Sequence, residues 1–325
     1  MTGRLRLGLV GTGWITTLHL AALERLARTE LVGTVSGDAD RAAAVAARWG
    51  GASYTDVPAM LDDARPHAVY VCQPPHRAAA ACELLVERGI PFLTEKPLAA
   101  VGADAERVAA ALRGRGLVVA VGYNWRGLDF LPLVRERLAK QPTRLVLARW
   151  TGQLPPPPWW RHVAESGGQV VEQATHLYDF ARLLVGEANV IAAESTRRAH
   201  AVHADADMAD LATAILRFDG GAIGSFTNTS ILASNRVSIE FLADGMRTVV
   251  ATVPDATKPT WRLTMDDGAG EQTIEAKRDS YEVQAAAFLD AVEANDPAKV
   301  LSTFEDALLT DRLTRAVVAA TARPG

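Results

Sequence analysis

The sequence predicts an α/β fold in two parts: an N-terminal doubly wound parallel sheet, and a C-terminal α+β domain built on a large, mostly antiparallel, open-faced sheet. The chain has 325 residues, roughly twice the length of about 150 residues that is typical of one domain. In its first third, short apolar runs alternate with helical stretches, and after Gly122 the pattern changes to strands joined by glycine or aspartate turns. These observations predict a division into residues 1–122 and 123–325.

The first domain is expected to consist of βαβ units. Strands alternating with helices of this length give a parallel sheet with right-handed crossovers. The expected strands are Leu5–Val10, Leu31–Val35, His67–Cys72, Ile90–Leu93 and Leu117–Val121, and the expected helices are Trp14–Ala27, Asp38–Trp49, Ala78–Arg88 and Ala103–Arg113.

The second domain is expected to be mainly a sheet between Val190 and Ile274, because turn residues there separate short apolar runs. Four consecutive prolines, Pro155–Pro158, exclude helix and inner strand and predict a rigid extended loop over Gln153–Pro158. The expected strands include Leu211–Phe218, Ala222–Thr229 and Val237–Leu242, and the expected helices are Phe130–Ala139, His176–Leu184, Tyr281–Ala294 and Thr303–Ala320. We expect the C-terminal helices to be able to pack back on the first domain.

Composition excludes several classes of protein. The chain is 49% apolar and 22% charged, which excludes wholesale disorder. Its 34 Lys and Arg against 38 Asp and Glu give a net charge of −4, which argues against binding of nucleic acid or of a membrane surface. The two cysteines, Cys72 and Cys82, cannot form a disulfide framework or a zinc site. With no recognisable signal peptide or apolar span, a cytoplasmic protein is the expectation.

A glycine turn joins the first expected strand to the first expected helix. Gly11 allows the tight turn, and Gly13 allows the backbone to approach phosphates at the helix N-terminus. This pattern predicts a dinucleotide-binding (Rossmann) domain in which Gly11, Thr12, Gly13, Trp14 and Ile15 contact the cofactor. Thr16 stands where the third glycine of the fingerprint is usual, and the competing interpretation is an ordinary glycine turn.

The end of the second strand selects the cofactor, because an acidic residue there binds the ribose and repels a 2′-phosphate. This chain has Ser36 and Gly37 there, and Arg41 follows shortly after. A neutral donor and a cation favour NADP. NAD remains possible, since Asp38 could reach the ribose or could instead cap the second helix.

Two further motifs carry candidate chemistry. Glu95-Lys96-Pro97 follows a strand end, where Lys96 could hydrogen-bond a substrate hydroxyl or form an ordinary surface pair with Glu95. Glu172 and His176 share a helix face if helix has formed by Gln173, and a histidine flanked by carboxylates suits a general base. The alternative is a buried histidine whose hydrogen bonds are satisfied within the fold.

The glycine turn, Glu95-Lys96-Pro97 and the block Glu172, His176 and Asp179 occur in an order and spacing that resembles the glucose–fructose oxidoreductase / inositol dehydrogenase / rhizopine-catabolism (Gfo/Idh/MocA) family of NAD(P)-dependent oxidoreductases. The resemblance implies that Lys96 and His176 are catalytic and that Glu172 replaces a usual aspartate. It also implies a second domain that binds a sugar or cyclitol on one sheet face and pairs subunits through the other, and so a homodimer or homotetramer.

The resemblance implies further contacts. Gln73, Pro74 and His76 lie in a loop that contacts the cofactor in the family, although Pro75 and Ala78 replace the asparagine and histidine that are common there. Trp160 and Arg161 match a Trp-Arg pair that lies near the cofactor in the family. Glu95 and Lys96 of the Glu-Lys-Pro motif are also expected to contact the cofactor. Tyr123, Asn124 and Arg126 are substrate contacts or hinge residues, and His19 is a packed residue of the first helix.

These observations predict an oxidoreductase that transfers hydride between a nicotinamide and a secondary hydroxyl or ketone of a sugar, cyclitol or related polyol. The predicted active site contains Lys96, His176 and Glu172. Substrate contacts are expected from these three residues and from Tyr123, Asn124 and Arg126. No metal is expected, because His200, His203, Asp205 and Asp207 lie in a polar link typical of a solvated loop. A glycosidase that oxidises and re-reduces its sugar, and a non-catalytic cofactor-binding regulator, are the alternatives.

Overall fold

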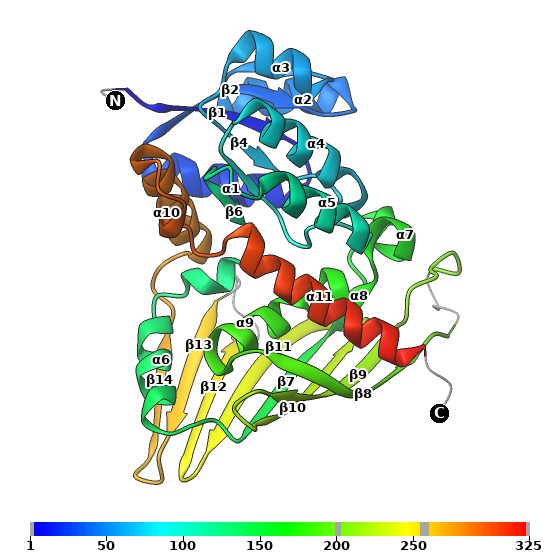
Figure 1. The fold of residues 1–325 in the computed structure, drawn as a ribbon, viewed down its shortest axis with the longest axis vertical. Helices are drawn as coiled ribbons and strands as arrows, with labels where there is room; N and C mark the ends of the chain where they lie inside the picture. Colours follow the sequence, from blue (N-terminus) through cyan, green and yellow to red (C-terminus); the bar gives the residue numbers. More distant parts are fainter. Residues whose placement is uncertain (1–2, 199–202, 254–259, 323–325) are drawn as a thin grey trace. The chain divides into compact units, whose positions relative to one another are not determined.

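The computed structural model describes residues 3–198, 203–253 and 260–322. The chain forms two units, each assembled from two segments (Figure 1). Unit 1 comprises Met1–Gly127 and Asp279–Leu308, and unit 2 comprises Leu128–Arg278 and Leu309–Gly325. The segment 279–308, which the division at residue 122 assigns to the second domain, therefore groups with unit 1.

Unit 1 is built on a six-stranded parallel sheet in the order β3-β2-β1-β4-β5-β6. The strand order reverses between β1 and β4, as it does in a Rossmann domain. The strands are β1 (Leu5–Val10), β2 (Thr29–Val35), β3 (Ala52–Tyr54), β4 (Ala68–Val71), β5 (Phe92–Thr94) and β6 (Val119–Val121). The helices of the first segment are α1 (Trp14–Leu26), α2 (Ala39–Trp49), α3 (Val57–Ala64), α4 (Pro75–Arg88), α5 (Gly102–Leu112) and the 3-10 turn η1 (Asn124–Gly127).

Both faces of this sheet are buried, which explains why its strands are almost continuously apolar. One face packs with α4 and α5, and the other with α1 and with α10 (Ser280–Ala294) from the second segment. The Phe288 ring of α10 meets the Tyr70 ring of β4 edge-on, with centroids 5.5 Å apart. Arg25 of α1 pairs with Asp279 and Glu282 at the start of α10. The 3-10 turn η3 (Pro297–Lys299) and the first residues of α11 (Phe304–Thr321) complete unit 1.

Strand β3 and helix α3, which were not predicted from the sequence, lie between the second predicted helix and the next predicted strand. Strand β3 has only three residues and pairs in parallel with β2. Helix α3 has eight residues and is capped by Asp56, whose carboxylate accepts the Ala59 backbone N–H. A short apolar run with a cap and a proline in its first turn was a usable signal for this helix.

Unit 2 is built on an eight-stranded sheet in the order β14-β13-β12-β11-β7-β10-β9-β8. All neighbouring pairs are antiparallel except β7 and β10, so the prediction of a large, mostly antiparallel sheet is confirmed. The strands are β7 (Leu145–Gln153), β8 (Ala188–Thr196), β9 (Leu211–Phe218), β10 (Ile223–Thr229), β11 (Ile231–Ala243), β12 (Met246–Thr252), β13 (Trp261–Asp266) and β14 (Glu271–Glu275). The helices are α6 (Leu131–Lys140), η2 (Pro158–Arg161), α7 (Val163–Ser166), α8 (Gln169–Glu172) and α9 (Thr175–Val185).

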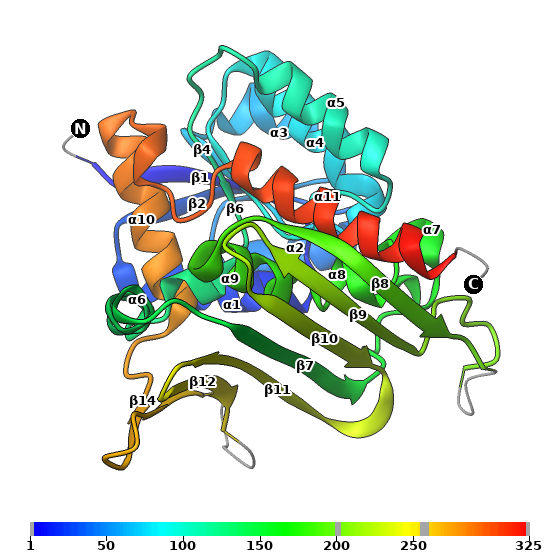
Figure 2. The same cartoon turned by 60° about the horizontal axis from the view of Figure 1, so that its bottom comes forward.

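One face of the unit 2 sheet carries α9, as Figure 2 shows. The Tyr178 ring of α9 stacks on Phe226 of β10, with centroids 4.6 Å apart. Alternate residues of β9, including Ala214 and Leu216, are buried, whereas Ile215 between them is 37% exposed. The period of two shows that this face of the sheet is packed and the opposite face is more open.

Two local predictions for unit 2 need correction. Gln153 is the last residue of β7 and Pro158 begins η2, so the irregular proline segment is shorter than the predicted Gln153–Pro158 loop. Strand β7, which was not predicted from the sequence, forms the centre of the sheet between β11 and β10.

Within the three described stretches of the chain, no helix has the length and apolar character that crossing a membrane requires.

Candidate functional site

Those residues of unit 1 that are predicted to bind the cofactor follow the strands of its sheet. Because the strands are parallel, the segments that follow them all emerge at the carboxyl edge. Ser36 follows β2, Gln73 follows β4 and Lys96 follows β5. The glycine turn follows β1, beside the point where the strand order reverses. This edge is the ligand crevice of an open α/β sheet.

Gly11 makes the turn that leads from β1 into α1. Its φ of +108° lies in a region that side chains rarely adopt, and a Cβ there would collide with the Cys72 carbonyl oxygen. Its backbone N–H donates to the Val35 carbonyl at 2.9 Å. The Thr16 hydroxyl donates to the Gly11 carbonyl at 3.0 Å, so the residue that replaces the third glycine ties the turn to the helix.

The N-terminus of α1 is open to a ligand. Gly13 is the N-cap residue, has extended backbone and receives no side-chain cap, and a Cβ added to it would have no neighbour within 4 Å. Trp14, the first residue of the helix, is 72% exposed. The backbone N–H groups of the first turn, together with the helix dipole, can therefore receive a pyrophosphate. The residues present fit the phosphate end of a dinucleotide.

The segment after β2 carries the predicted cofactor selector. The Ser36 hydroxyl accepts a hydrogen bond from the Thr12 hydroxyl at 3.0 Å and from the Asp38 N–H at 3.3 Å. Asp38 caps α2 by accepting the Asp40 and Arg41 N–H groups, and its other oxygen lies 3.7 Å from the Arg41 guanidinium. The helix-capping interpretation of Asp38 is confirmed, and Arg41 is partly neutralised by this pairing.

The loop after β4 starts α4 with prolines. Pro74 is the N-cap residue of α4, and Gln73 precedes it with a buried side-chain oxygen that has no hydrogen-bond partner among the described residues. The His76 imidazole accepts a hydrogen bond from Arg77 at 3.2 Å. Arg77, which the sequence analysis did not single out, lies with one guanidinium nitrogen 3.8 Å from the position of a Cβ on Gly37.

Glu95 is held in the interior of unit 1. Its Oε1 lies 2.7 Å from His19 Nε2, and only 1% of the His19 side chain and 8% of the Glu95 side chain are exposed. Tyr70 and Tyr281 meet the His19 ring edge-on. Burial of a carboxylate requires such a partner. His19 is therefore more than the packed residue predicted from the sequence, because it fixes the first residue of the Glu-Lys-Pro motif.

The second oxygen of Glu95 accepts the Lys96 backbone N–H at 3.1 Å. Gly122, which follows β6, lies so close to Glu95 that an added Cβ would fall 2.6 Å from its carboxylate. The peptide between Lys96 and Pro97 is cis. His19, Glu95 and Gly122 thus fix the backbone from which the Lys96 side chain extends at the carboxyl edge.

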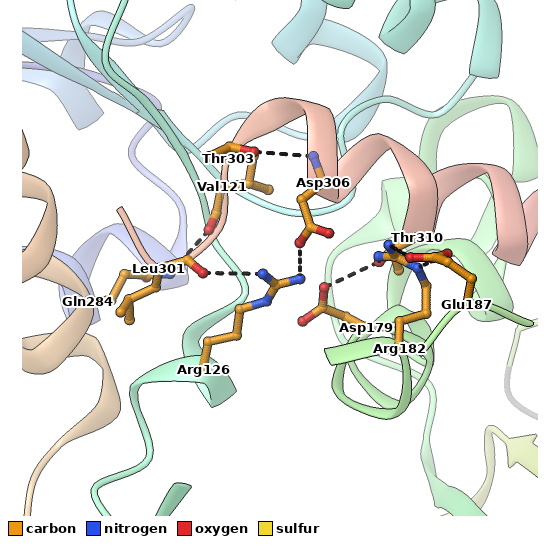
Figure 3. A network of polar contacts seen from close by, with 10 residues as sticks. All are labelled: Val121, Arg126, Asp179, Arg182, Glu187, Gln284, Leu301, Thr303, Asp306 and Thr310. Carbon is orange, nitrogen blue, oxygen red and sulfur yellow. Dashed lines mark hydrogen bonds and ion pairs between the residues drawn. The ribbon is translucent and has the colours of Figure 1, made fainter. Parts of the chain in front are cut away.

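The side chains of the segment after β6 make contacts within unit 1. Asn124 donates to the Ser280 hydroxyl at 3.0 Å, and Tyr123 is 1% exposed. Arg126 pairs with Asp306 and donates to the Leu301 carbonyl at 3.2 Å, while Gln284 donates to the Val121 carbonyl (Figure 3). These contacts lie within unit 1, and the role of the three residues as substrate contacts or hinge residues stays a prediction.

In unit 2, Glu172 and His176 lie on two short helices rather than one. Glu172 is the last residue of α8, and α9 begins at Thr175. The two residues between the helices interrupt the continuous helix from Gln173 that would place Glu172 and His176 on one face. Glu172 and His176 are both buried, at 5% and 7% exposure. The His176 imidazole stacks against Trp150 of β7, with centroids 6.1 Å apart and 23° between the planes.

A buried polar chain fixes α8 on the sheet. Asn228 of β10 donates to Gln169 at 2.9 Å, and Gln169 donates to Gln173 at 2.9 Å. Gln173 follows Glu172 directly, and Asn228 is the β10 partner of Trp150. The sheet therefore sets the positions of both α8 and the aromatic ring beside His176. The sequence analysis did not identify these amides, whose partners come from separate elements.

Asp179 supports α11 within unit 2. Its carboxylate accepts the Thr310 hydroxyl at 3.2 Å, and Thr310 in turn accepts from Arg182 at 2.7 Å (Figure 3). Arg182 also pairs with Glu187 just past the end of α9. Asp179 is therefore a structural partner of α11, one turn of helix away from His176.

Trp160 and Arg161 occupy η2. Trp160 is buried beside Trp159, and Arg161 lies 3.4 Å from Asp205. Asp207 accepts the Val163 N–H at 2.7 Å. His200 lies outside the described residues, and within them no group of three or more His, Cys, Asp or Glu could hold a metal ion. Asp205 and Asp207 instead anchor η2 and α7.

Two family models match the chain. The oxidoreductase family with an NAD-binding Rossmann fold matches residues 5–123, and the GFO/IDH/MocA C-terminal domain matches residues 142–250. The chain therefore belongs to the Gfo/Idh/MocA family of oxidoreductases, and the resemblance seen in its motifs is confirmed.

Similar proteins span nearly the whole chain. Myo-inositol 2-dehydrogenase of Thermotoga maritima is 23% identical over 91% of this chain and 90% of its own. 1,5-Anhydro-D-fructose reductase of Ensifer adhaerens is 26% identical over 89% of each. Among solved structures, a 3-ketoreductase from Actinomadura kijaniata with NADP and TDP-benzene has a TM-score of 0.84 at 24% identity, covering 98% of each chain. Levoglucosan dehydrogenase with NADH has a TM-score of 0.86 at 19% identity, covering 98% of this chain and 97% of its own, so the fold is shared.

Replacing His19 tests the buried pair. His19→Leu leaves Glu95 Oε1 buried without its partner, and we expect the free energy of unfolding to fall by about 1–3 kcal/mol. His19→Gln, which keeps a side-chain donor, should lose less. Urea denaturation followed by circular dichroism measures both. His67→Leu is the control. The His67 ring accepts the Arg6 backbone N–H, at 3.3 Å and exposed to water that can replace it, so its loss should change stability by no more than about 0.5 kcal/mol. Equal losses at His19 and His67 would contradict the pairing.

Proposed function

We propose that this oxidoreductase transfers hydride between a nicotinamide cofactor and a secondary hydroxyl or ketone of a sugar, cyclitol or related polyol. The observation that carries the proposal is the buried His19–Glu95 pair, which fixes Lys96 at the same sheet edge as an open helix N-terminus preceded by glycines. The named dehydrogenases and reductases that resemble the chain act on sugars or cyclitols, which supports the substrate class.

Residues of the carboxyl edge would hold the cofactor. The turn Gly11–Thr12–Gly13 with Trp14 and Ile15 would receive the pyrophosphate at the start of α1. We propose contacts to the rest of the cofactor from Ser36, Gly37, Arg41, Gln73, Pro74, His76, Glu95, Lys96, Trp160 and Arg161. When bound, the nicotinamide supplies the redox chemistry, because it gives or accepts the hydride.

We infer that NADP(H) binds more tightly than NAD(H). No acidic side chain takes the position at the end of β2 that repels a 2′-phosphate, since Ser36 stands there. Asp38, the carboxylate that could reach a ribose, caps α2 instead. A neutral hydroxyl donor at this point favours the phosphorylated cofactor.

Lys96 would donate a hydrogen bond to the substrate oxygen at which charge develops. A cationic donor held before the reaction stabilises an alkoxide with little reorganisation. Its backbone is fixed through Glu95, which limits the freedom of the side chain to its own rotamers. This arrangement suits a group whose position matters in the transition state.

His176 would accept the hydroxyl proton during oxidation and return it during reduction. Imidazole is the side chain whose ordinary pKa allows both near neutral pH. The stack on Trp150 restricts the orientation of the ring. Glu172, buried at the end of α8, would orient His176 or bind a neighbouring substrate hydroxyl.

Alanine variants test these roles. His176→Ala should lower the rate of hydride transfer about 10²–10⁴-fold, the usual contribution of a positioned acid or base. Lys96→Ala should cost about 10²–10³-fold, because a charged donor to the oxyanion is lost. The measurement is single-turnover formation of reduced cofactor with a sugar or cyclitol substrate, with cofactor affinity measured alongside.

Cofactor affinity separates catalysis from structure in these variants. Both should retain cofactor binding, since the pyrophosphate would be held by the turn around Gly13. A near wild-type rate for His176→Ala would refute its role in proton transfer. Loss of cofactor binding in both variants would instead make the two residues structural supports.

We also propose that the protein forms a homodimer or homotetramer through the open face of the unit 2 sheet. Apolar side chains lie on exposed positions of three of its strands: Leu147 of β7 is 37% exposed, Ile215 of β9 is 37% exposed and Ile191 of β8 is 55% exposed. Apolar surface gathered on one face is typical of an association site.

Charge substitution tests this face. Ile215→Glu, at an exposed position of β9, should shift the molar mass in light scattering towards that of one chain, because association would bury the added charge. Val318→Glu is the control, since Val318 is 39% exposed on α11, whose Thr310 bonds to α9 on the packed face of the sheet. A wild-type monomer at micromolar concentration would contradict the proposal.

A further inference from the structure

Arg77 lies in the first turn of α4, and its guanidinium reaches the segment after β2. Its Nη1 is 3.8 Å from the position that a Cβ on Gly37 would occupy, which is the distance of an ordinary van der Waals contact. The contact joins two loops that both leave the carboxyl edge of the unit 1 sheet, on either side of the glycine turn.

The charge of Arg77 is available to a ligand. The side chain is exposed, and within the described part of the chain no carboxylate pairs with it. Its Nε donates to His76 Nε2 at 3.2 Å, which orients the guanidinium through a ring nitrogen that carries no negative charge. Arg41, by contrast, pairs with Asp38 at 3.7 Å and is 70% exposed. Arg77 is therefore the cation near Gly37 whose charge is not already compensated.

Ser36 completes an anion site beside it. Its hydroxyl oxygen accepts from the Thr12 hydroxyl and from the Asp38 N–H, so its own hydrogen remains to be donated. Gly37 follows Ser36 directly, and the Arg77 guanidinium lies 3.8 Å from the position of a Cβ on Gly37. A hydroxyl donor and a guanidinium at one point form the donor set that a phosphate monoester prefers.

We infer that Arg77 is a specificity residue that pairs with the 2′-phosphate of NADP(H), together with Ser36. The inference rests on the proposed function and deepens it, since it names the group that distinguishes the two cofactors. The phosphate carries close to two negative charges at neutral pH. The guanidinium can meet two of its oxygens at once, which a lysine ammonium cannot do.

A guanidinium at this place could instead stack on the adenine ring. Stacking would favour NADP and NAD alike, because both carry the same base. Pairing with the 2′-phosphate would favour NADP alone. The two interpretations therefore differ in one measurable quantity, the ratio of the two affinities.

The experiment is calorimetric titration of the full-length protein with NADP⁺ and with NAD⁺ at low ionic strength. Arg77→Ala should weaken NADP⁺ binding about tenfold to a hundredfold, the loss expected for hydrogen bonds between charged groups. It should leave NAD⁺ binding within about twofold. Arg113→Ala is the matched control, because Arg113 is an exposed arginine of the same unit at the C-terminal end of α5. The control should change neither affinity by more than twofold.

A second variant and a salt titration distinguish the possible roles of Arg77. Arg77→Lys should recover part of the NADP⁺ affinity through charge alone, and added salt should reduce the wild-type preference for NADP⁺. Equal weakening of both cofactors by Arg77→Ala would overturn the inference in favour of stacking. No change in either affinity would overturn it in favour of a plain surface residue. Both outcomes leave the proposed function intact, whereas a wild-type protein that binds neither cofactor would overturn both.

Discussion

The close approach of Gly11 to the Cys72 carbonyl is the constraint on which the binding edge depends. The chain must leave β1, turn with positive φ and enter α1 while it touches the end of β4. Any side chain at residue 11 would force β1 and β4 apart. Because the strand order reverses between these two strands, this contact lies at the edge where open α/β sheets bind ligands, and it sets where α1 begins.

Buried polar pairs fix further segments that carry candidate site residues. Glu95 is kept in the interior by His19 from α1, and it fixes the backbone of Lys96. In unit 2 the chain from Asn228 through Gln169 to Gln173 does the same for α8, next to Glu172. In both units, buried hydrogen bonds therefore support the backbone next to the candidate catalytic side chains. Breaking such a bond leaves a buried polar group unpaired, and this cost in free energy disfavours other arrangements of the backbone.

The sequence predicted what depends on local pattern. The Gly11 turn and the strand before it were recognisable because glycine spacing and apolar periodicity act within a few residues. Strand β7 was also within reach, since Val146 and Ala148 alternate with exposed residues, but the proline run after it obscured the pattern. The break between Glu172 and Thr175 was not predictable, because tertiary contacts of α8 override the local preference for helix.

Contacts between distant residues could not be read from the sequence. His19 looked like a packed helix residue because its partner Glu95 is 76 positions away. Arg77 was not predicted to be a functional residue, because its neighbour, Gly37, belongs to another βα unit. Asn124 and Arg126 follow β6, and their partners Ser280 and Asp306 come from the segment 279–308, more than 150 positions away in the sequence.

The most direct test of the account is NADP⁺ binding by a Gly13→Val variant. Gly13 has ordinary φ, and a Cβ there meets no atom within 4 Å, so the free protein should accept the side chain and keep its melting temperature. The same side chain would occupy the space proposed for the pyrophosphate. The account predicts unchanged thermal unfolding and a loss of NADP⁺ affinity of at least about a hundredfold by calorimetry, which corresponds to roughly 3 kcal/mol. Wild-type affinity in a folded Gly13→Val protein would contradict it.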